Sequence, residues 1–136
     1  QPYVQQHFRT GPDKMLVGQS LAALLATEIL LKKPALFNQY VMMSPSLWWD
    51  NQSLLKQAPQ LLRNLPSSPL KVYLAVGNEG PEMVSDARAL AALIRKNKPR
   101  NTQFVFEYLP KEDHGTILHP ATLNAFAHFF PRPPEK

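Results

Sequence analysis

The sequence predicts an α/β fold with about four parallel strands and helices on both faces of the sheet. Short apolar runs rich in strand-forming residues alternate along the chain with longer segments that carry Ala and Leu at helical spacing. Strands separated by helices need crossover connections, and such connections form parallel sheets with helices on the sheet faces. A length of 136 residues suits one domain with a real core and is too short for two. We therefore treat residues 1–136 as a single domain.

Turn and helix-boundary signals set the bounds of each element. Prolines, glycines and the Ser44-Pro45 and Gly77-Asn78 pairs close the periodic segments. The expected strands are residues 14–17, 40–43, 70–76 and 102–109. The expected helices are residues 2–8, 20–33, 54–65 with an interruption at Pro59, 82–96 and 119–130, followed by a polar, proline-rich tail over 131–136.

Composition excludes several functional classes. The net charge of +5 comes from scattered Lys and Arg residues, without a basic stripe interleaved with aromatics, so nucleic acid is not an expected partner. No apolar run approaches the length that spans a membrane. The absence of cysteine removes disulfides, thiolate metal sites and cysteine nucleophiles, and it leaves the cellular compartment open. Apart from His114 and His119 in one loop, no histidines or carboxylates stand at metal-ligand spacing, and no glycine-rich phosphate loop is present, so neither a metal nor a cofactor is expected.

The segment Gly18-Gln19-Ser20-Leu21-Ala22 lies where a strand-like run stops and a helix-like run begins. A strand, a sharp turn that bears a serine, and a helix form the context of a nucleophile elbow. We therefore predict that Ser20 is a nucleophile and that the backbone N–H of Leu21 stabilises an oxyanion. The alternative is that Ser20 caps the helix with a hydrogen bond to a backbone N–H near Ala23.

The other candidate residues also follow predicted strands, and ligands of parallel sheets bind at the carboxyl ends of strands. His114 follows the fourth strand and is the predicted general base, which would deprotonate Ser20 and later protonate the leaving alcohol. His119 directly precedes a proline and fits a helix start better. His7 and His128 lie on predicted helices and are interpreted as structural.

The acid that orients the histidine is less well defined. Glu79 is nearest to the end of the third strand and is the first choice, and Glu82 is the second. Asp86 is expected on the helix surface, and Asp113 is expected to point away from the neighbouring His114. A Ser-His dyad assisted by water or a backbone carbonyl is a further alternative.

Aromatic and polar residues after the second strand are candidates for substrate contact. Ser46, Trp48 and Trp49 lie there. A tryptophan beside the strand ends could stack on an aryl group or cover an acyl chain, whereas the alternative is simple packing in the core. The sequence does not decide which tryptophan, if either, faces a pocket.

Three motifs of the chain belong together: Gly18-Gln19-Ser20-Leu21-Ala22, Ser44-Pro45-Ser46-Leu47-Trp48-Trp49-Asp50 and Asp113-His114-Gly115-Thr116. Together they resemble the putative esterase family of α/β hydrolases, which includes esterase D-like and siderophore-esterase-like enzymes. The resemblance spans nearly the whole chain, and its middle motif is the most specific. It implies hydrolysis of a small-molecule carboxylic ester through an acyl-serine. The chain departs from the family pattern at Gln19, where a histidine is usual, and at Ala22-Ala23, where a glycine pair is usual.

The resemblance also implies that this chain corresponds to the C-terminal half of the family fold. A complete enzyme of the family begins with further strands, and one of their loops supplies the second oxyanion N–H. We therefore expect weak catalysis, and an open apolar edge at the strand containing Met15, Leu16 and Val17, where the chain self-associates or binds an N-terminal fragment. The alternative functions are a non-catalytic binding module and an interaction module that recruits a partner through this edge.

Overall fold

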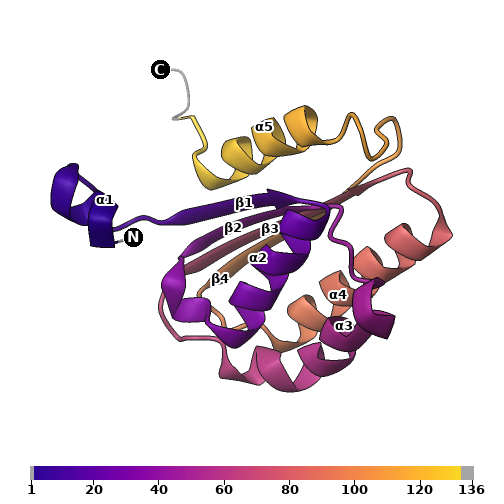
Figure 1. Ribbon diagram of the computed structural model, residues 1–136, viewed down its shortest axis with the longest axis horizontal. Coiled ribbons are helices and arrows are strands. Elements are labelled where there is room, and N and C mark those ends of the chain that lie inside the picture. The colour runs from indigo at the N-terminus through magenta and orange to yellow at the C-terminus, as the bar shows by residue number, and fades with distance from the viewer. Residues whose placement is uncertain (1, 133–136) are drawn as a thin grey trace.

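The computed structural model describes residues 2–132, so the last four residues of the predicted tail lie outside the described part. Four strands form one parallel sheet in the order β1 (Met15–Gln19), β2 (Gln39–Met43), β3 (Leu70–Gly77) and β4 (Thr102–Leu109) (Figure 1). The predicted α/β class with about four parallel strands is confirmed. The carboxyl ends of all four strands lie at the same edge of the sheet, and this edge carries the candidate residues.

Helices cover both faces of the sheet. The covering helices are α2 (Leu21–Lys32), α3 (Trp49–Leu61), α4 (Pro81–Asn97) and α5 (Leu118–Phe129). Helix α1 (Pro2–His7) has no buried residue and lies beside the sheet. Figure 1 shows α2, α3 and α4 on one face and α5 on the opposite face. Of the helices formed by residues 2–132, none combines the length and apolar character needed to cross a bilayer.

The two central strands are apolar on both sides because both of their faces are covered. On β2, Tyr40 and Met42 pack into the core under α2, α3 and α4, whereas Val41 and Met43 pack under α5. All four side chains are fully buried. This continuous burial explains why residues 40–43 of β2 and residues 72–76 of β3 appear in the sequence as uninterrupted apolar runs.

The third helix differs from the prediction. It begins at Trp49 and runs past Pro59 to Leu61 before a 3-10 turn over Leu62–Asn64, so the expected interruption at Pro59 is wrong. Burial of Leu54, Ala58 and Leu62 in the core offsets the cost of an interior proline, which is about 3 kcal/mol. Its first turn is irregular, because residues 50–52 have positive φ angles of 50°, 52° and 59°.

A polar cluster under α5 joins this helix to the sheet. The hydroxyl of Tyr73 donates to Glu107 Oε2 at 2.6 Å, Asn124 donates to the same oxygen at 2.9 Å, and His128 lies 2.9 Å from Glu107 Oε1. Burial raises the pKa of Glu107, but these hydrogen bonds outweigh burial and hold the pKa below its usual value. Burial and the neighbouring carboxylate raise the pKa of Tyr73 well above its usual range.

Strand β1 forms one edge of the sheet. Within the described residues its one strand neighbour is β2, and the Val17 side chain is 41% exposed although it lies in a strand. Leu21 and Leu25 on the adjoining helix α2 are also exposed. The apolar edge expected from the sequence is therefore present, and its occupation by a partner stays a prediction.

Candidate active site

Ser20 occupies the sharp turn between β1 and α2. Its φ of 60° and ψ of −122° are unusual for a residue with a Cβ atom, and they mark a strained turn. The strand and the helix approach each other closely at Gly18, where an added Cβ would lie 2.4 Å from the carbonyl oxygen of Ala22. The Ser20 side chain makes no capping hydrogen bond to α2, so the alternative of a side-chain helix cap is not realised.

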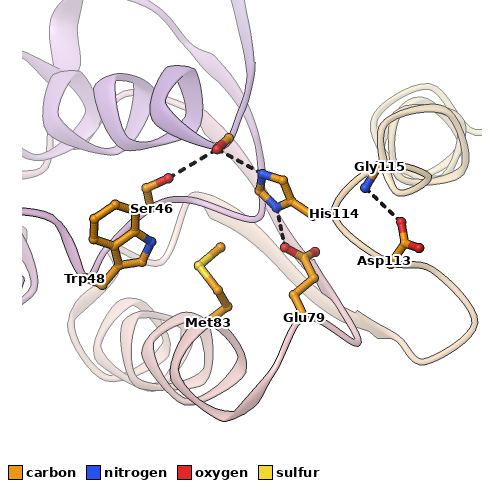
Figure 2. Close-up of a pocket in the computed structure, with 8 residues that line it drawn as sticks. Ser46, Trp48, Glu79, Met83, Asp113, His114 and Gly115 are labelled. Atoms are coloured by element: carbon orange, nitrogen blue, oxygen red, sulfur yellow. Dashed lines mark hydrogen bonds and ion pairs between the residues drawn. The ribbon is translucent and has the colours of Figure 1, made fainter.

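The Ser20 hydroxyl is directed at His114 instead. In Figure 2 the His114 imidazole faces the Glu79 carboxylate. Ser20 Oγ lies 3.0 Å from His114 Nε2, and His114 Nδ1 lies 2.5 Å from Glu79 Oε2. A carboxylate at Nδ1 favours the tautomer with its proton on that nitrogen, which leaves Nε2 as the acceptor of the serine proton. The structure thus brings together Ser20, His114 and the first-choice acid Glu79.

The Glu79 carboxylate is almost fully buried, with 3% of its side chain exposed. Its Oε1 atom accepts a hydrogen bond from the backbone N–H of Gly77 at 3.0 Å and another from the Ser44 hydroxyl. Gly77 leaves room for this arrangement, because a Cβ there would lie 2.6 Å from the carbonyl oxygen of Glu112. The Glu79 carboxylate is therefore bound by one group at the end of β3 and one directly after β2.

The turn that carries His114 is ordered by its own neighbours. Asp113 Oδ1 accepts the backbone N–H groups of Gly115 at 2.8 Å and Thr116 at 3.0 Å, and Thr116 Oγ1 accepts the N–H of Asp113 at 3.0 Å. These bonds direct the Asp113 carboxylate into the turn, away from the imidazole. Gln19 connects the turn to β1, since its Nε2 donates to the His114 carbonyl oxygen at 2.5 Å. Gln19 is one of the positions at which the sequence departs from the pattern of the family that it resembles.

A cavity of about 520 Å³ opens beside the Ser20 hydroxyl. Trp48 forms one wall of it (Figure 2). Trp49 lines a separate hollow with residues of α2 and α3. Of the three expected substrate-contacting residues, Ser46 and Trp48 therefore line this cavity and Trp49 does not. Its lining residues are Ser20, Ser46, Trp48, Glu79, Met83, Asp113, His114 and Gly115.

Ser46 is the neighbour of Ser20 within the cavity. The two hydroxyl oxygens lie 3.3 Å apart. Either hydroxyl can donate in this bond, and Ser46 is its donor when Ser20 donates its proton to His114. Sequence reasoning missed Met83, which reaches the cavity from α4, and nothing in the local sequence separates it from an ordinary apolar helix residue.

The remaining candidates lie apart from this arrangement. Glu82, the second-choice acid, is exposed in the first turn of α4, and Glu79 occupies the imidazole nitrogen that an acid would use. Asp86, expected on the surface, is buried, because α4 packs against α3 there and Asp86 accepts a hydrogen bond from Gln52 at 3.0 Å. His119 lies in the first turn of α5. Within residues 2–132, no group of three or more His, Cys, Asp or Glu side chains is arranged to hold a metal ion.

At the strand ends of this parallel sheet, a serine hydroxyl is hydrogen-bonded to an imidazole, and the imidazole to a buried carboxylate. This arrangement defines the α/β-hydrolase class. The order of the three along the chain, serine, acid, histidine, is that of this class. The backbone N–H of Leu21 lies at the N-terminus of α2, among the amides that a helix leaves without intrahelical partners, so it is available to an oxyanion.

Within this class the chain belongs to the putative esterase family, whose sequence model matches residues 1–119. The siderophore enterobactin esterase of Emericella nidulans is 29% identical over 132 residues, covering 78% of this chain and 43% of that protein. The ferri-bacillibactin esterase of Bacillus subtilis is 28% identical over 124 residues, covering 86% of this chain and 43% of that protein. The chain therefore spans less than half the length of these curated relatives.

Solved structures show the same fold. An IroE-like serine hydrolase from Shewanella oneidensis superimposes with a TM-score of 0.85 at 24% sequence identity, covering 95% of this chain and 43% of that one. The sheet and helices described above thus correspond to part of a larger α/β-hydrolase domain in that structure.

Proposed function

We propose that this chain carries the catalytic centre of a serine esterase that hydrolyses carboxylic esters through an acyl-Ser20 intermediate. One observation carries the proposal, namely the 3.0 Å contact from Ser20 Oγ to His114 Nε2 together with the Glu79 carboxylate on His114 Nδ1. Membership of the putative esterase family supports the same reaction class.

The reaction follows from these contacts. Ser20 Oγ attacks the ester carbonyl carbon while His114 Nε2 takes the hydroxyl proton, and the buried Glu79 carboxylate stabilises the imidazolium. The Leu21 N–H donates to the oxyanion of the tetrahedral intermediate. The intermediate collapses to acyl-Ser20 as the alcohol departs with the proton from His114. Water then attacks the acyl group, with His114 again as base, and releases the acid.

The cavity and the relatives bear on the substrate. Trp48 and Met83 give the 520 Å³ cavity an apolar wall, and Ser46 gives it a hydroxyl donor. These groups suit an ester whose acyl or alcohol part is aromatic or aliphatic. One relative is named a siderophore enterobactin esterase and another a ferri-bacillibactin esterase, which supports esters of this kind as substrates of the whole protein.

We expect turnover by this chain alone to be slow. The family resemblance assigns the second oxyanion donor to a loop outside these 136 residues. Loss of one such donor costs on the order of a hundred- to a thousandfold in rate. A reagent that reports nucleophile activation directly is therefore a better first test than steady-state hydrolysis.

The test is reaction with a fluorophosphonate probe, mapped by peptide mass spectrometry. We expect a single covalent adduct on Ser20 and none in the Ser20→Ala variant. Ser85→Ala is the matched control, because Ser85 is an exposed serine on α4 whose hydroxyl donates to the Glu82 carbonyl oxygen. An unlabelled Ser20 in the folded chain would contradict the proposal and favour the binding or interaction module.

The exposed edge of β1 supports a second proposal, that the chain associates with itself or with another polypeptide there. Val17 is 41% exposed, and Leu21 and Leu25 are each 55% exposed. Unpaired backbone groups and apolar side chains at an edge favour strand addition. Light scattering at micromolar concentration should detect species larger than a monomer, and Val17→Lys should shift them toward monomer. A purely monomeric wild-type chain would count against self-association.

A further inference from the structure

Ser44 is a buried serine in a strained conformation directly after β2. Its side chain is fully buried, its φ is 48°, and its backbone N–H donates to the Ala75 carbonyl oxygen at 2.8 Å. A positive φ is costly for a residue with a Cβ atom, and glycine would adopt it more easily. The strain indicates that the Ser44 side chain has a use at this position.

The Ser44 hydroxyl donates to Glu79 Oε1. The same oxygen accepts the N–H of Gly77 at 3.0 Å, while the other carboxylate oxygen faces His114 Nδ1 at 2.5 Å. The terminal torsion of a glutamate is broad and weakly restricted by its own covalent structure. Two donors on Oε1 therefore set the plane of the carboxylate and with it the position of Oε2.

The motif that contains Ser44 acts at two points of the hydrogen-bonded chain. Ser44 contacts the acid, and Ser46, two residues later, contacts the nucleophilic oxygen of Ser20. Both hydroxyls come from the Ser-Pro-Ser segment at the end of β2, which lies between β1 with its serine and β3 with its acid. This one turn can thus fix the distance between Ser20 and Glu79.

We propose that Ser44 is a positioning residue whose hydroxyl holds the Glu79 carboxylate in the orientation that contacts His114. Its effect on reactivity rests on the function proposed above, whereas its effect on the Glu79–His114 hydrogen bond does not. The two can therefore be measured separately. The Ser44 hydroxyl bonds to Glu79 and not to Ser20, and Ser44 does not line the cavity, so it acts through Glu79.

The experiment compares Ser44→Ala, Ser44→Gly and the matched control Ser85→Ala in the full chain. Both Ser44 variants lack the hydroxyl, but only glycine relieves the positive φ. The first readout is the rate of fluorophosphonate labelling at Ser20. The second is the downfield proton resonance of the His114 Nδ1–H, which is identified by its absence from His114→Ala and is measured also in Ser20→Ala.

We expect labelling to fall about tenfold in both Ser44 variants, the order expected when one hydrogen bond to a charged group is lost. The imidazole resonance should broaden or disappear in both, because a loosened Nδ1–H exchanges faster with water. Ser85→Ala should match the wild-type chain in both readouts, and Ser20→Ala should keep the resonance.

Wild-type labelling and an unchanged resonance in Ser44→Ala would overturn the proposal. So would a labelling defect that Ser44→Gly restores, since that result would assign Ser44 a backbone role only. Unfolding of both variants, measured by circular dichroism, would also count against the proposal, because it would show that Ser44 is needed for folding rather than for positioning Glu79. A chain in which Ser20 is never labelled but the resonance still depends on Ser44 would reject the esterase function and keep the positioning role.

Discussion

The His114→Ala variant is expected to lose at least about a hundredfold in the rate at which Ser20 reacts with a fluorophosphonate. The physical reason is that His114 Nε2 lies 3.0 Å from Ser20 Oγ as its basic partner, and a positioned general base contributes about a hundred- to ten-thousandfold. The measurement is a time course of adduct formation by intact-mass spectrometry, with the adduct site confirmed by peptide mapping.

His119→Ala is the matched control for this variant. His119 is an exposed histidine five positions further along the chain, in the first turn of α5, and it should label at the wild-type rate. The same assay separates the two candidate acids, because Glu79→Gln should slow labelling whereas Glu82→Gln should not. Equal rates in His114→Ala and His119→Ala would remove the basis for assigning His114 as the base.

The Gly18→Ala variant should be destabilised by about 3 kcal/mol or more, at or above the upper end of the usual cost of overpacking. An added Cβ would lie 2.4 Å from the Ala22 carbonyl oxygen and 2.8 Å from the Ala23 nitrogen. Both are helix backbone atoms, so relief requires that α2 moves away from β1 as a unit. The free energy of unfolding, measured by urea titration, checks this value.

Gly11→Ala supplies the control for the glycine substitution. Nothing lies within 4 Å of a Cβ at Gly11, so we expect its stability to stay within about 0.5 kcal/mol of wild type. Movement of α2 would also displace Ser20 and Leu21, so Gly18→Ala should lose Ser20 labelling even where it remains folded. A Gly18→Ala chain as stable as Gly11→Ala would contradict the close approach described at the serine turn.

The order of strand-like and helix-like segments along the sequence predicted the fold class and the location of the site at the strand ends. Strands β2 and β3 were predictable because burial on both faces leaves them continuously apolar, and the serine and histidine were placed at strand ends by the chain order alone. Helix α3 was harder, since the core contacts that carry the helix through Pro59 come from residues distant in sequence.

The choice between Glu79 and Glu82 shows where sequence reasoning stops. Both follow β3 within five residues, and only the path of the turn determines which carboxylate reaches the imidazole. That path depends on Gly77 and on the Asn78 N–H bond to the Glu112 carbonyl oxygen at 2.7 Å, which joins the acid loop to the histidine loop. Ser44 was missed for a related reason, because a positive φ at a serine leaves no signal in composition or periodicity.

Ser20 follows directly on the strand whose outer side is open in the described part of the chain. Gln19 ends the strand and the next residue bears the reactive hydroxyl, so a polypeptide that docks along β1 would stiffen the backbone that presents it. Reactivity would then scale with the concentration of that second polypeptide as well as with the concentration of this one. A chain built in this way lends itself to fragment complementation, in which ester cleavage serves as the signal that two separately supplied pieces have met.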